Sequence, residues 1–263
     1  MNLLTINPIS SCNLKCKHCP NKKWTYPIDD EEHNRINNEI IFKWLNKYFN
    51  PYEWFLEISG GEPGLYKEIS ELILKLNSMG YYGIIRTNGT LPIPKSDNFI
   101  RLAGWHKPIG LSHPPRYCDI MLITQNPDDC WHDKAKYCAD NNIPYKCIPY
   151  KRFGDPTFED DPIHGDVKRN TFFKHWTIVS SSGGIAYCYA HWGEEKDNII
   201  NMSPPLMRDM RNNCQNCGGM LGLLEFMDDD FRQKLALRRD KYIFSESSFE
   251  KKLEFIKVQQ EVL

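Results

Sequence analysis

Hydrophobic residues in the first half of the chain fall into short continuous runs that alternate with stripes at helical spacing. The short runs predict strands at residues 3–8, 54–59, 82–87, 109–112 and 145–150. The stripes predict helices at residues 39–49, 69–79 and 127–141. Strand, helix and strand in steps of about 30 residues argue for βαβ units and a parallel sheet.

Polar or glycine-rich motifs follow three of these predicted strands. The segment CNLKCKHCP follows the first strand, GGEP follows the second, and TNGT closes the third. An ordinary turn would explain GGEP or TNGT taken alone. However, parallel sheets place active sites at the carboxyl ends of their strands, so we expect the three motifs to converge on one pocket.

The pattern changes after residue 153. Residues 154–164 are rich in Pro, Gly and Asp and predict a linker. Two strand-like runs around Ser181-Ser182-Gly183 predict a hairpin at 176–180 and 184–189, and the charged segment from residue 221 predicts a helical tail. The expected organisation is a core at 1–153, a linker at 154–164, a second region at 165–220 and a tail at 221–263.

Composition and charge narrow the class of protein. The 263 residues are 41% hydrophobic, enough for one large domain or a domain with an appendage. The formal net charge of -1 gives no basic field of the kind that binds nucleic-acid polymers. No apolar run reaches the roughly 20 residues of a membrane span, and the first residues do not resemble a signal peptide. We therefore expect a cytoplasmic protein whose cysteines are metal ligands or buried thiols rather than disulfides.

Three cysteines, Cys12, Cys16 and Cys19, are spaced C-x3-C-x2-C in one short segment. Three thiolates can hold three irons of a [4Fe–4S] cluster, which normally takes four. The next cysteine is Cys118, so the remaining iron would be open to a non-protein ligand, as in reactive metal sites. A closed zinc site is the alternative, but its fourth ligand would be His18, which is wedged between Cys16 and Cys19.

This spacing resembles the signature of the radical S-adenosylmethionine (radical SAM) superfamily, C-x3-C-x-φ-C, in which φ is an aromatic-type residue. The resemblance implies that Cys12, Cys16 and Cys19 hold a [4Fe–4S] cluster, that S-adenosylmethionine (SAM) takes the open iron, and that His18 flanks the adenine. It implies reductive cleavage of SAM to a 5′-deoxyadenosyl radical, with an electron donor such as flavodoxin or ferredoxin. The fold it implies is α/β, a partial (β/α)6 TIM-type barrel with a small C-terminal cluster-binding appendage and a helical tail.

The GGEP motif, Gly60 to Pro63, supports the same resemblance. Two glycines after a strand let the backbone approach a ligand closely, and the carboxylate of Glu62 can accept a hydrogen bond from an ammonium group. In the family this motif, here Gly60, Gly61 and Glu62, binds the methionyl amine of SAM. Less specific candidates for contacts with the cofactor or the substrate are Arg86, Asn88, Ser112 and His113.

A second set of cysteines, Cys188, Cys214 and Cys217, follows the predicted hairpin. The set resembles the SPASM domain or its shortened twitch form, which holds an auxiliary [4Fe–4S] cluster. The shortened form usually has another cysteine before the hairpin, and none lies between Cys147 and Cys188. Histidines that could replace it are His164, His175 and His191. A zinc site made by these cysteines and one histidine fits the ligand rules as well.

Four further cysteines lie outside both sets. Cys138 and Cys147 fall in a predicted helix and a predicted strand, where buried thiols act as small apolar side chains. Cys118 and Cys130 lie in less regular sequence.

The leading interpretation is an enzyme that abstracts a hydrogen atom from a small-molecule or nucleoside-like substrate, giving oxidation or rearrangement. The first alternative is radical modification of a peptide or protein side chain. Enzymes of that kind often carry an N-terminal peptide-binding module, for which we expect no room before a strand that begins near residue 3. The second alternative is a non-catalytic metal-binding scaffold.

Overall fold

The computed structural model describes residues 2–16, 19, 25–105, 110–125, 129–149, 175–186 and 197–209. In this part of the chain the strands form one sheet in the order β6-β5-β4-β3-β2-β1-β7-β8-β9, and β10 pairs with β7. Each of the first six strands pairs in parallel with the next one along the chain. These strands are β1 (Asn2–Ile6), β2 (Trp54–Ile58), β3 (Gly83–Thr87), β4 (Phe99–Gly104), β5 (Ile120–Gln125) and β6 (Tyr145–Pro149). The later strands are β7 (His175–Val179), β8 (Gly184–Ala186), β9 (Asp197–Asn198) and β10 (Arg208–Asp209).

The helices are α1 (Asn38–Tyr48), α2 (Ile69–Ser78) and α3 (Trp131–Asp140), and two short 3-10 helices are η2 (Pro63–Leu65) and η6 (Ile199–Asn201). The sequence predicts α1 and α2 at nearly these bounds because their buried residues follow helical spacing. Helix α1 also has a capping side chain, since Asn37 accepts a hydrogen bond from the N–H of Ile40 at 3.0 Å. Helix α3 begins at Trp131, and residues 127–128 of the predicted helix lie outside the described residues.

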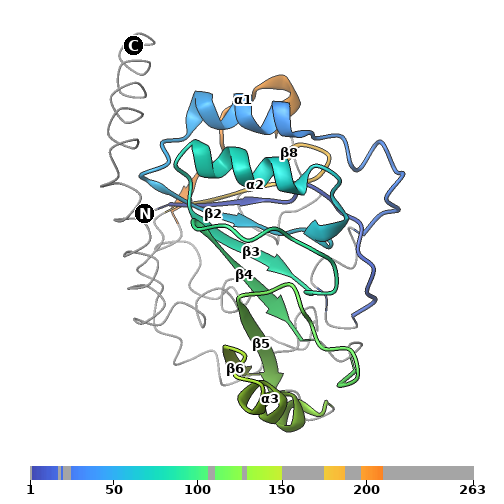
Figure 1. Cartoon of the computed structure of the whole chain (residues 1–263). Helices are drawn as coiled ribbons and strands as arrows, with labels where there is room; N and C mark the ends of the chain where they lie inside the picture. The colour runs from blue at the N-terminus through green and yellow to red at the C-terminus, as the bar shows by residue number, and fades with distance from the viewer. Residues whose placement is uncertain are drawn as a thin grey trace.

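All three described helices pack on the same face of the sheet (Figure 1). Ile6, Ile58 and Ile85 of successive strands share one core cluster with the buried residues of α1 and α2. Met121 of β5 packs in a second cluster with Cys138 of α3. Side chains alternate along a strand, so on each strand the residues directly before and after a helix-facing residue point to the opposite face of the sheet. We call this face the inner face.

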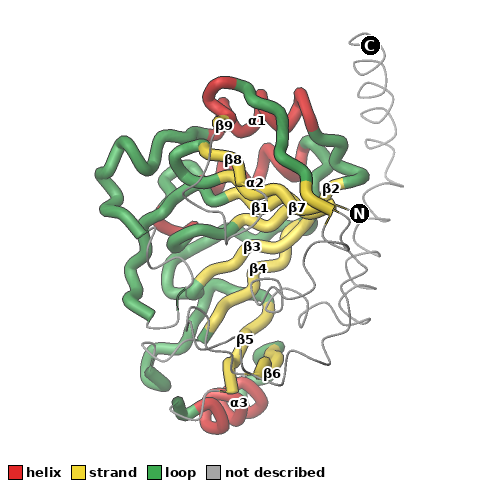
Figure 2. Tube along the Cα trace, turned by 180° about the vertical axis from the view of Figure 1, so that it is seen from behind, coloured by secondary structure: helices red, strands yellow, loops and turns green. Residues whose placement is uncertain are grey.

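The mostly parallel α/β sheet confirms the predicted fold class at that level. Within the described residues the strand order runs from β6 to β9 without closing, so the (β/α)6 barrel stays a prediction. The neighbouring strands β7, β1, β2 and β3 are seen from behind in Figure 2. None of the helices described is long and apolar enough to cross a bilayer.

The hairpin predicted around Ser181 is present as β7 and β8. Gly183 adopts a positive φ of 88° at its turn, a conformation that favours glycine. Strand β7 pairs in parallel with β1, so the hairpin extends the same sheet. The division at 1–153, 154–164, 165–220 and 221–263 stays a prediction, and the proposed linker and tail lie outside the described residues.

The strand predicted at residues 109–112 is wrong. Residues 110–112 form a turn in which the N–H of His113 donates to the carbonyl of Gly110 at 3.3 Å. The fourth and fifth strands along the chain are instead β4 and β5, which the apolar pattern did not identify. Arg101 interrupts the apolar run of β4, yet it is buried, because its guanidinium forms an ion pair with Asp119 at 3.0 Å.

Candidate functional site

The backbone after β1 runs directly beside the GGEP motif. The N–H of Gly61 donates to the carbonyl of Ile9 at 2.9 Å, and that of Glu62 donates to the carbonyl of Ser11 at 2.7 Å. A Cβ atom on Gly61 would lie 1.9 Å from the Ser11 oxygen, so only glycine permits this approach. Gly60 has a φ of 112°, which also favours glycine. The two glycines therefore hold the segment that leads into Cys12.

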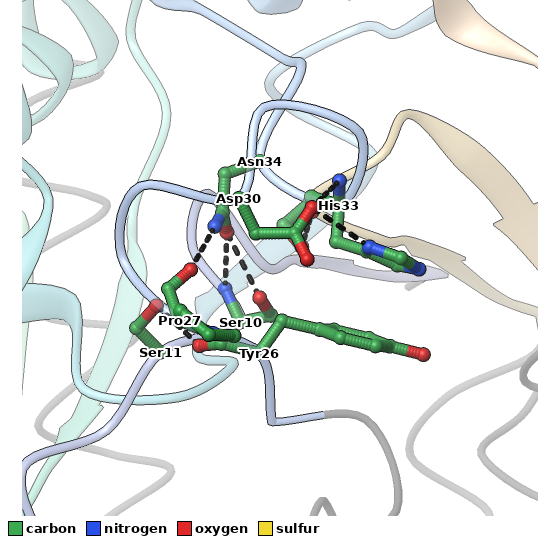
Figure 3. A network of polar contacts seen from close by, with 8 residues as sticks. Ser10, Ser11, Tyr26, Pro27, Asp30, His33 and Asn34 are labelled. Atoms are coloured by element: carbon green, nitrogen blue, oxygen red, sulfur yellow. Dashed lines mark hydrogen bonds and ion pairs between the residues drawn. The ribbon is translucent and has the colours of Figure 1, made fainter.

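A loop formed by residues 26–36, which we call the clamp loop, also holds this segment through side-chain hydrogen bonds (Figure 3). Asn34 Oδ1 accepts hydrogen bonds from both the N–H and the Oγ of Ser10, at 3.0 and 2.9 Å. Ser11 Oγ donates to the carbonyl of Tyr26 at 2.6 Å. The clamp loop also contacts the β7–β8 turn, because the N–H of Ile36 donates to the carbonyl of Ser181 at 3.1 Å.

The thiols of Cys12, Cys16 and Cys19 are half-buried. Burial raises the pKa of Cys12, and the nearby charges of Glu62 and Cys19 raise it further. Burial, followed by the charges of Cys19 and Cys12, raises the pKa of Cys16 to about 11. The thiolate form of one of these cysteines therefore disfavours the thiolate form of the next.

This donor set fits an iron–sulfur cluster, because thiolates are its ligands and its cationic irons would offset their repulsion. Among the described residues, however, no three His, Cys, Asp or Glu side chains are arranged around a common metal position. Lys17 and His18, between the second and third cysteines, lie outside the described residues. The assignment of the cysteines as cluster ligands and of His18 as the adenine neighbour stays a prediction.

Glu62 is a buried carboxylate that joins the ends of β2 and β3. Its Oε1 accepts from Thr87 Oγ1 at 2.6 Å and from the N–H of Gly64 at 3.0 Å, and its Oε2 accepts from the N–H of Asn88 at 2.7 Å. Burial raises the pKa of Glu62, while these three donors oppose the rise. No ion pair involves this carboxylate within the described residues. An ionised carboxylate offers about four acceptor positions, so one remains for a further donor.

Asn88 connects the third motif to the cysteine segment. Its Nδ2 donates to Asn13 Oδ1 at 2.8 Å and lies 4.0 Å from the sulfur of Cys12. Thr90 Oγ1 donates to Asn88 Oδ1 at 2.6 Å and accepts from Asn13 Nδ2 at 2.9 Å. The cysteine segment, GGEP and TNGT therefore meet at the carboxyl ends of β1, β2 and β3, where the parallel sheet predicted them.

Two other predicted residues lie elsewhere. Ser112 is exposed, lies 2.9 Å from the ring nitrogen of His113, and lines a pocket with Cys118 and other residues. No hydrogen bond described for Ser112 joins it to Cys12, Glu62 or Asn88. His175 lies at the start of β7, where its Nδ1 is 3.1 Å from Asn2 Oδ1, at the end of the sheet opposite the cysteine segment.

The second cysteine set falls outside the described residues, which leaves its metal a prediction. The residues concerned are Cys188, Cys214, Cys217, His164 and His191.

Of the remaining cysteines, Cys138 is buried as expected, Cys147 and Cys118 are half-buried, and Cys130 is exposed.

The sequence predicted Arg86 as a candidate contact, but it predicted neither the clamp loop nor the pairing of Arg86 with Glu57. The loop residues show no periodicity and no motif, so the sequence carries no signal for their contacts with Ser10 and Ser11. A signal for the pair exists in hindsight. Glu57 and Arg86 are charged residues inside predicted strands, and buried charges in a sheet require partners.

Comparison with known proteins finds partial sequence matches and a likeness of fold. No family model matches the chain. The chain is 36% identical over 93 residues to 7-carboxy-7-deazaguanine synthase from Bacteroides thetaiotaomicron, covering 35% of this chain and 44% of that protein. It is 34% identical over 88 residues to Fe-coproporphyrin III synthase from Methanosarcina barkeri, covering 32% of this chain and 20% of that protein. The chain thus matches less than half the length of these curated relatives.

Among solved structures, SuiB from Streptococcus suis bound to the precursor peptide SuiA has a TM-score of 0.50 at 14% identity, over 88% of this chain and 65% of that chain. At this identity the likeness is one of fold. These proteins are all radical SAM enzymes, so the resemblance to the radical SAM superfamily is confirmed.

Proposed function

We propose that this chain is a radical SAM enzyme that binds SAM at a [4Fe–4S] cluster held by Cys12, Cys16 and Cys19. The observation that carries the proposal is the hydrogen-bonded junction of the cysteine segment with Glu62 and Asn88 at the carboxyl ends of three parallel strands. The chemistry that such a pair of cofactors supplies when bound is reductive cleavage of the sulfonium and abstraction of a hydrogen atom from a substrate.

The protein's own part in this chemistry is to bind and orient SAM. Gly60 and Gly61 bring the backbone close to the cysteine segment, so a ligand there meets main-chain polar groups rather than side chains. Glu62 has a free acceptor position and no cationic partner among the described residues, which suits the methionyl ammonium. Thr87 and Asn88 fix the direction of that carboxylate.

The proposed substrate is a small organic molecule, which is oxidised or rearranged. Both curated relatives are named as synthases of small molecules. SuiB, in contrast, is bound to a precursor peptide, and its likeness to this chain extends to the fold alone. Modification of a peptide is therefore the alternative. The electron donor that we propose is a flavodoxin or a ferredoxin.

The test of this proposal is SAM cleavage. Protein reconstituted with iron and sulfide without oxygen, then given dithionite and SAM, should release 5′-deoxyadenosine. The Cys16→Ala variant should release none, whereas Cys130→Ala, which removes an exposed thiol, should match the wild type. Protein that carries about four irons at the first site and forms no 5′-deoxyadenosine would support a metal-binding scaffold instead.

The substrate class has a separate test. Deuterated small metabolites and deuterated peptides are supplied in turn, and the mass of the 5′-deoxyadenosine is measured. Deuterium from a small metabolite supports the proposal, and deuterium from a peptide alone supports the alternative.

The proposed auxiliary site at Cys188, Cys214 and Cys217 predicts a lower metal content in a double Cys214→Ala, Cys217→Ala variant. Loss of iron indicates a second iron–sulfur cluster, and loss of zinc indicates the zinc alternative. Metal content equal to that of the wild type would remove the site.

A further inference from the structure

A row of polar residues crosses the inner face of the sheet next to the carboxyl ends of the first three strands. Pairing of Ile6 with Ile58 and of Ile58 with Ile85 sets the register, so the residues that follow, Asn7, Ser59 and Arg86, lie side by side. The three isoleucines belong to the helix-side core, so the three polar residues face the other way.

Arg86 is held in this row by a buried carboxylate. Glu57 lies on the inner face of β2, two residues before Ser59. It is fully buried and pairs with Arg86 Nε. The other Glu57 oxygen accepts from Thr5 Oγ1 at 2.7 Å, and Thr5 Oγ1 accepts from Trp176 Nε1 at 2.9 Å. A buried carboxylate requires such partners, and together they fix the position of the guanidinium. The Arg86 side chain is 32% exposed, and Arg86 is the one residue of β3 that is not buried.

Asn7 adds a buried acceptor to the row. Its side chain is fully buried, and Nδ2 donates to the carbonyl of Val179 at 3.2 Å. In the described part of the chain, Asn7 Oδ1 is buried and has no hydrogen-bond partner. A buried acceptor without a donor is costly, so this oxygen points to a bound molecule with a hydroxyl or amine group.

The row lies next to the candidate cofactor site. A Cβ atom on Gly60 would be 3.1 Å from Asn7 Cβ, which places Asn7 against the GGEP motif. Arg86 precedes Asn88 by two residues, about 6.6 Å along a strand, and Asn88 Nδ2 is 4.0 Å from the Cys12 sulfur. A small molecule in contact with Arg86 would therefore extend to the place where SAM is proposed to react.

We propose that this row anchors the substrate, and that the substrate is a small anion with a hydroxyl or amine group. Arg86 binds the carboxylate or phosphate, Asn7 Oδ1 accepts from the hydroxyl or amine, and Glu57 is a positioning residue for Arg86. The assignment deepens the proposed function and rests on it. A guanidinium presents a planar set of donors that matches either kind of anion.

The experiment measures thermal stabilisation of the reconstituted protein by succinate, malate and phosphate, with chloride at equal ionic strength as the reference. Succinate or phosphate should raise the Tm in a saturable way, and the one that does so identifies the anion. Arg86→Gln should weaken the apparent affinity by roughly 10- to 100-fold, as expected for a lost charge-assisted hydrogen bond. Arg116→Gln, which removes an exposed arginine, should leave the affinity unchanged.

Two more variants keep the test decisive. Arg86→Gln leaves Glu57 buried without its charge partner, so the double variant Glu57→Gln, Arg86→Gln is measured as well, because its amide pair replaces the ion pair. Malate carries one hydroxyl more than succinate and should bind more tightly to the wild type, but equally to Asn7→Leu. Equal affinity in the wild type would overturn the role of Asn7.

The outcomes separate this inference from the proposed function. Absence of stabilisation by all three anions, or full stabilisation of the double variant, overturns the anchoring role. Formation of 5′-deoxyadenosine by the wild type without added substrate tests the proposed function separately from anion binding. A wild type that cleaves SAM but is stabilised by none of the anions overturns this inference and leaves the proposed function standing.

Discussion

Replacement of Glu62 tests the account of the site most directly, because three donors from two strand ends meet on this one side chain. In Glu62→Ala the Thr87 hydroxyl and the N–H groups of Gly64 and Asn88 lose their acceptor in a buried place. An unsatisfied buried donor costs about 1–3 kcal/mol, and water entering the space left by the side chain recovers part of this. We therefore expect a loss of about 3–5 kcal/mol, which is a large fraction of a typical unfolding free energy.

Glu62→Gln distinguishes hydrogen bonding from side-chain volume. The amide oxygen can still accept from Thr87 and Gly64, but the amide nitrogen then faces the N–H of Asn88, which is also a donor. One charge-assisted hydrogen bond is lost, so the expected cost is about 2–3 kcal/mol although the volume is unchanged.

Urea denaturation followed by circular dichroism measures both variants, with a shift in midpoint at constant slope as the expected result. Glu53→Gln makes the same chemical change at an exposed position and should alter the unfolding free energy by less than about 0.5 kcal/mol. If Glu62→Gln is as stable as Glu53→Gln, the carboxylate does not hold the strand ends together and the reasoning fails.

Further predictions concern the glycines and the pH dependence of stability. In Gly61→Ala the new Cβ would lie 1.9 Å from the Ser11 oxygen, so the variant should lose both stability and iron; full iron content after reconstitution would contradict this. Gly83→Ala, whose Cβ would lie 1.8 Å from a carbonyl oxygen within the sheet, should lose stability but keep its iron when folded. Burial acts to raise the pKa of Asp119, but hydrogen bonds and charge from Arg101 outweigh it and lower the pKa below the unfolded value of about 3.9. The stabilisation from this pair is therefore present above that pH and is lost as the pH falls through the folded pKa, so the difference in urea midpoint between wild type and Asp119→Asn should shrink below about pH 4.

The sequence predicted the parts of the molecule that follow from periodicity and from short motifs. Helices α1 and α2 were predicted because their buried residues repeat at helical spacing. The meeting of Cys12, Glu62 and Asn88 followed from the rule that parallel strands end at the same edge of a sheet.

The parts that the sequence did not predict depend on partners far along the chain. Because Arg101 is charged, the sequence of β4 resembles an exposed segment. The ion pair with Asp119, which allows Arg101 to be buried, cannot be predicted from the local sequence. Asn34 lies in a loop without regular structure, and no local sequence pattern predicts its hydrogen bonds with Ser10. Such pairings are set by tertiary packing, which overrides local propensity.

The clamp loop gives the two halves of the described chain a shared support. It grips the residues just before Cys12 through Asn34, and it grips the β7–β8 turn through Ile36. A displacement of that hairpin would therefore change the position of the clamp loop, and with it the position of the segment that leads into Cys12. A displacement of that segment would act on the hairpin through the same contacts. The β7–β8 turn and the residues just before Cys12 therefore depend on the same loop for their positions.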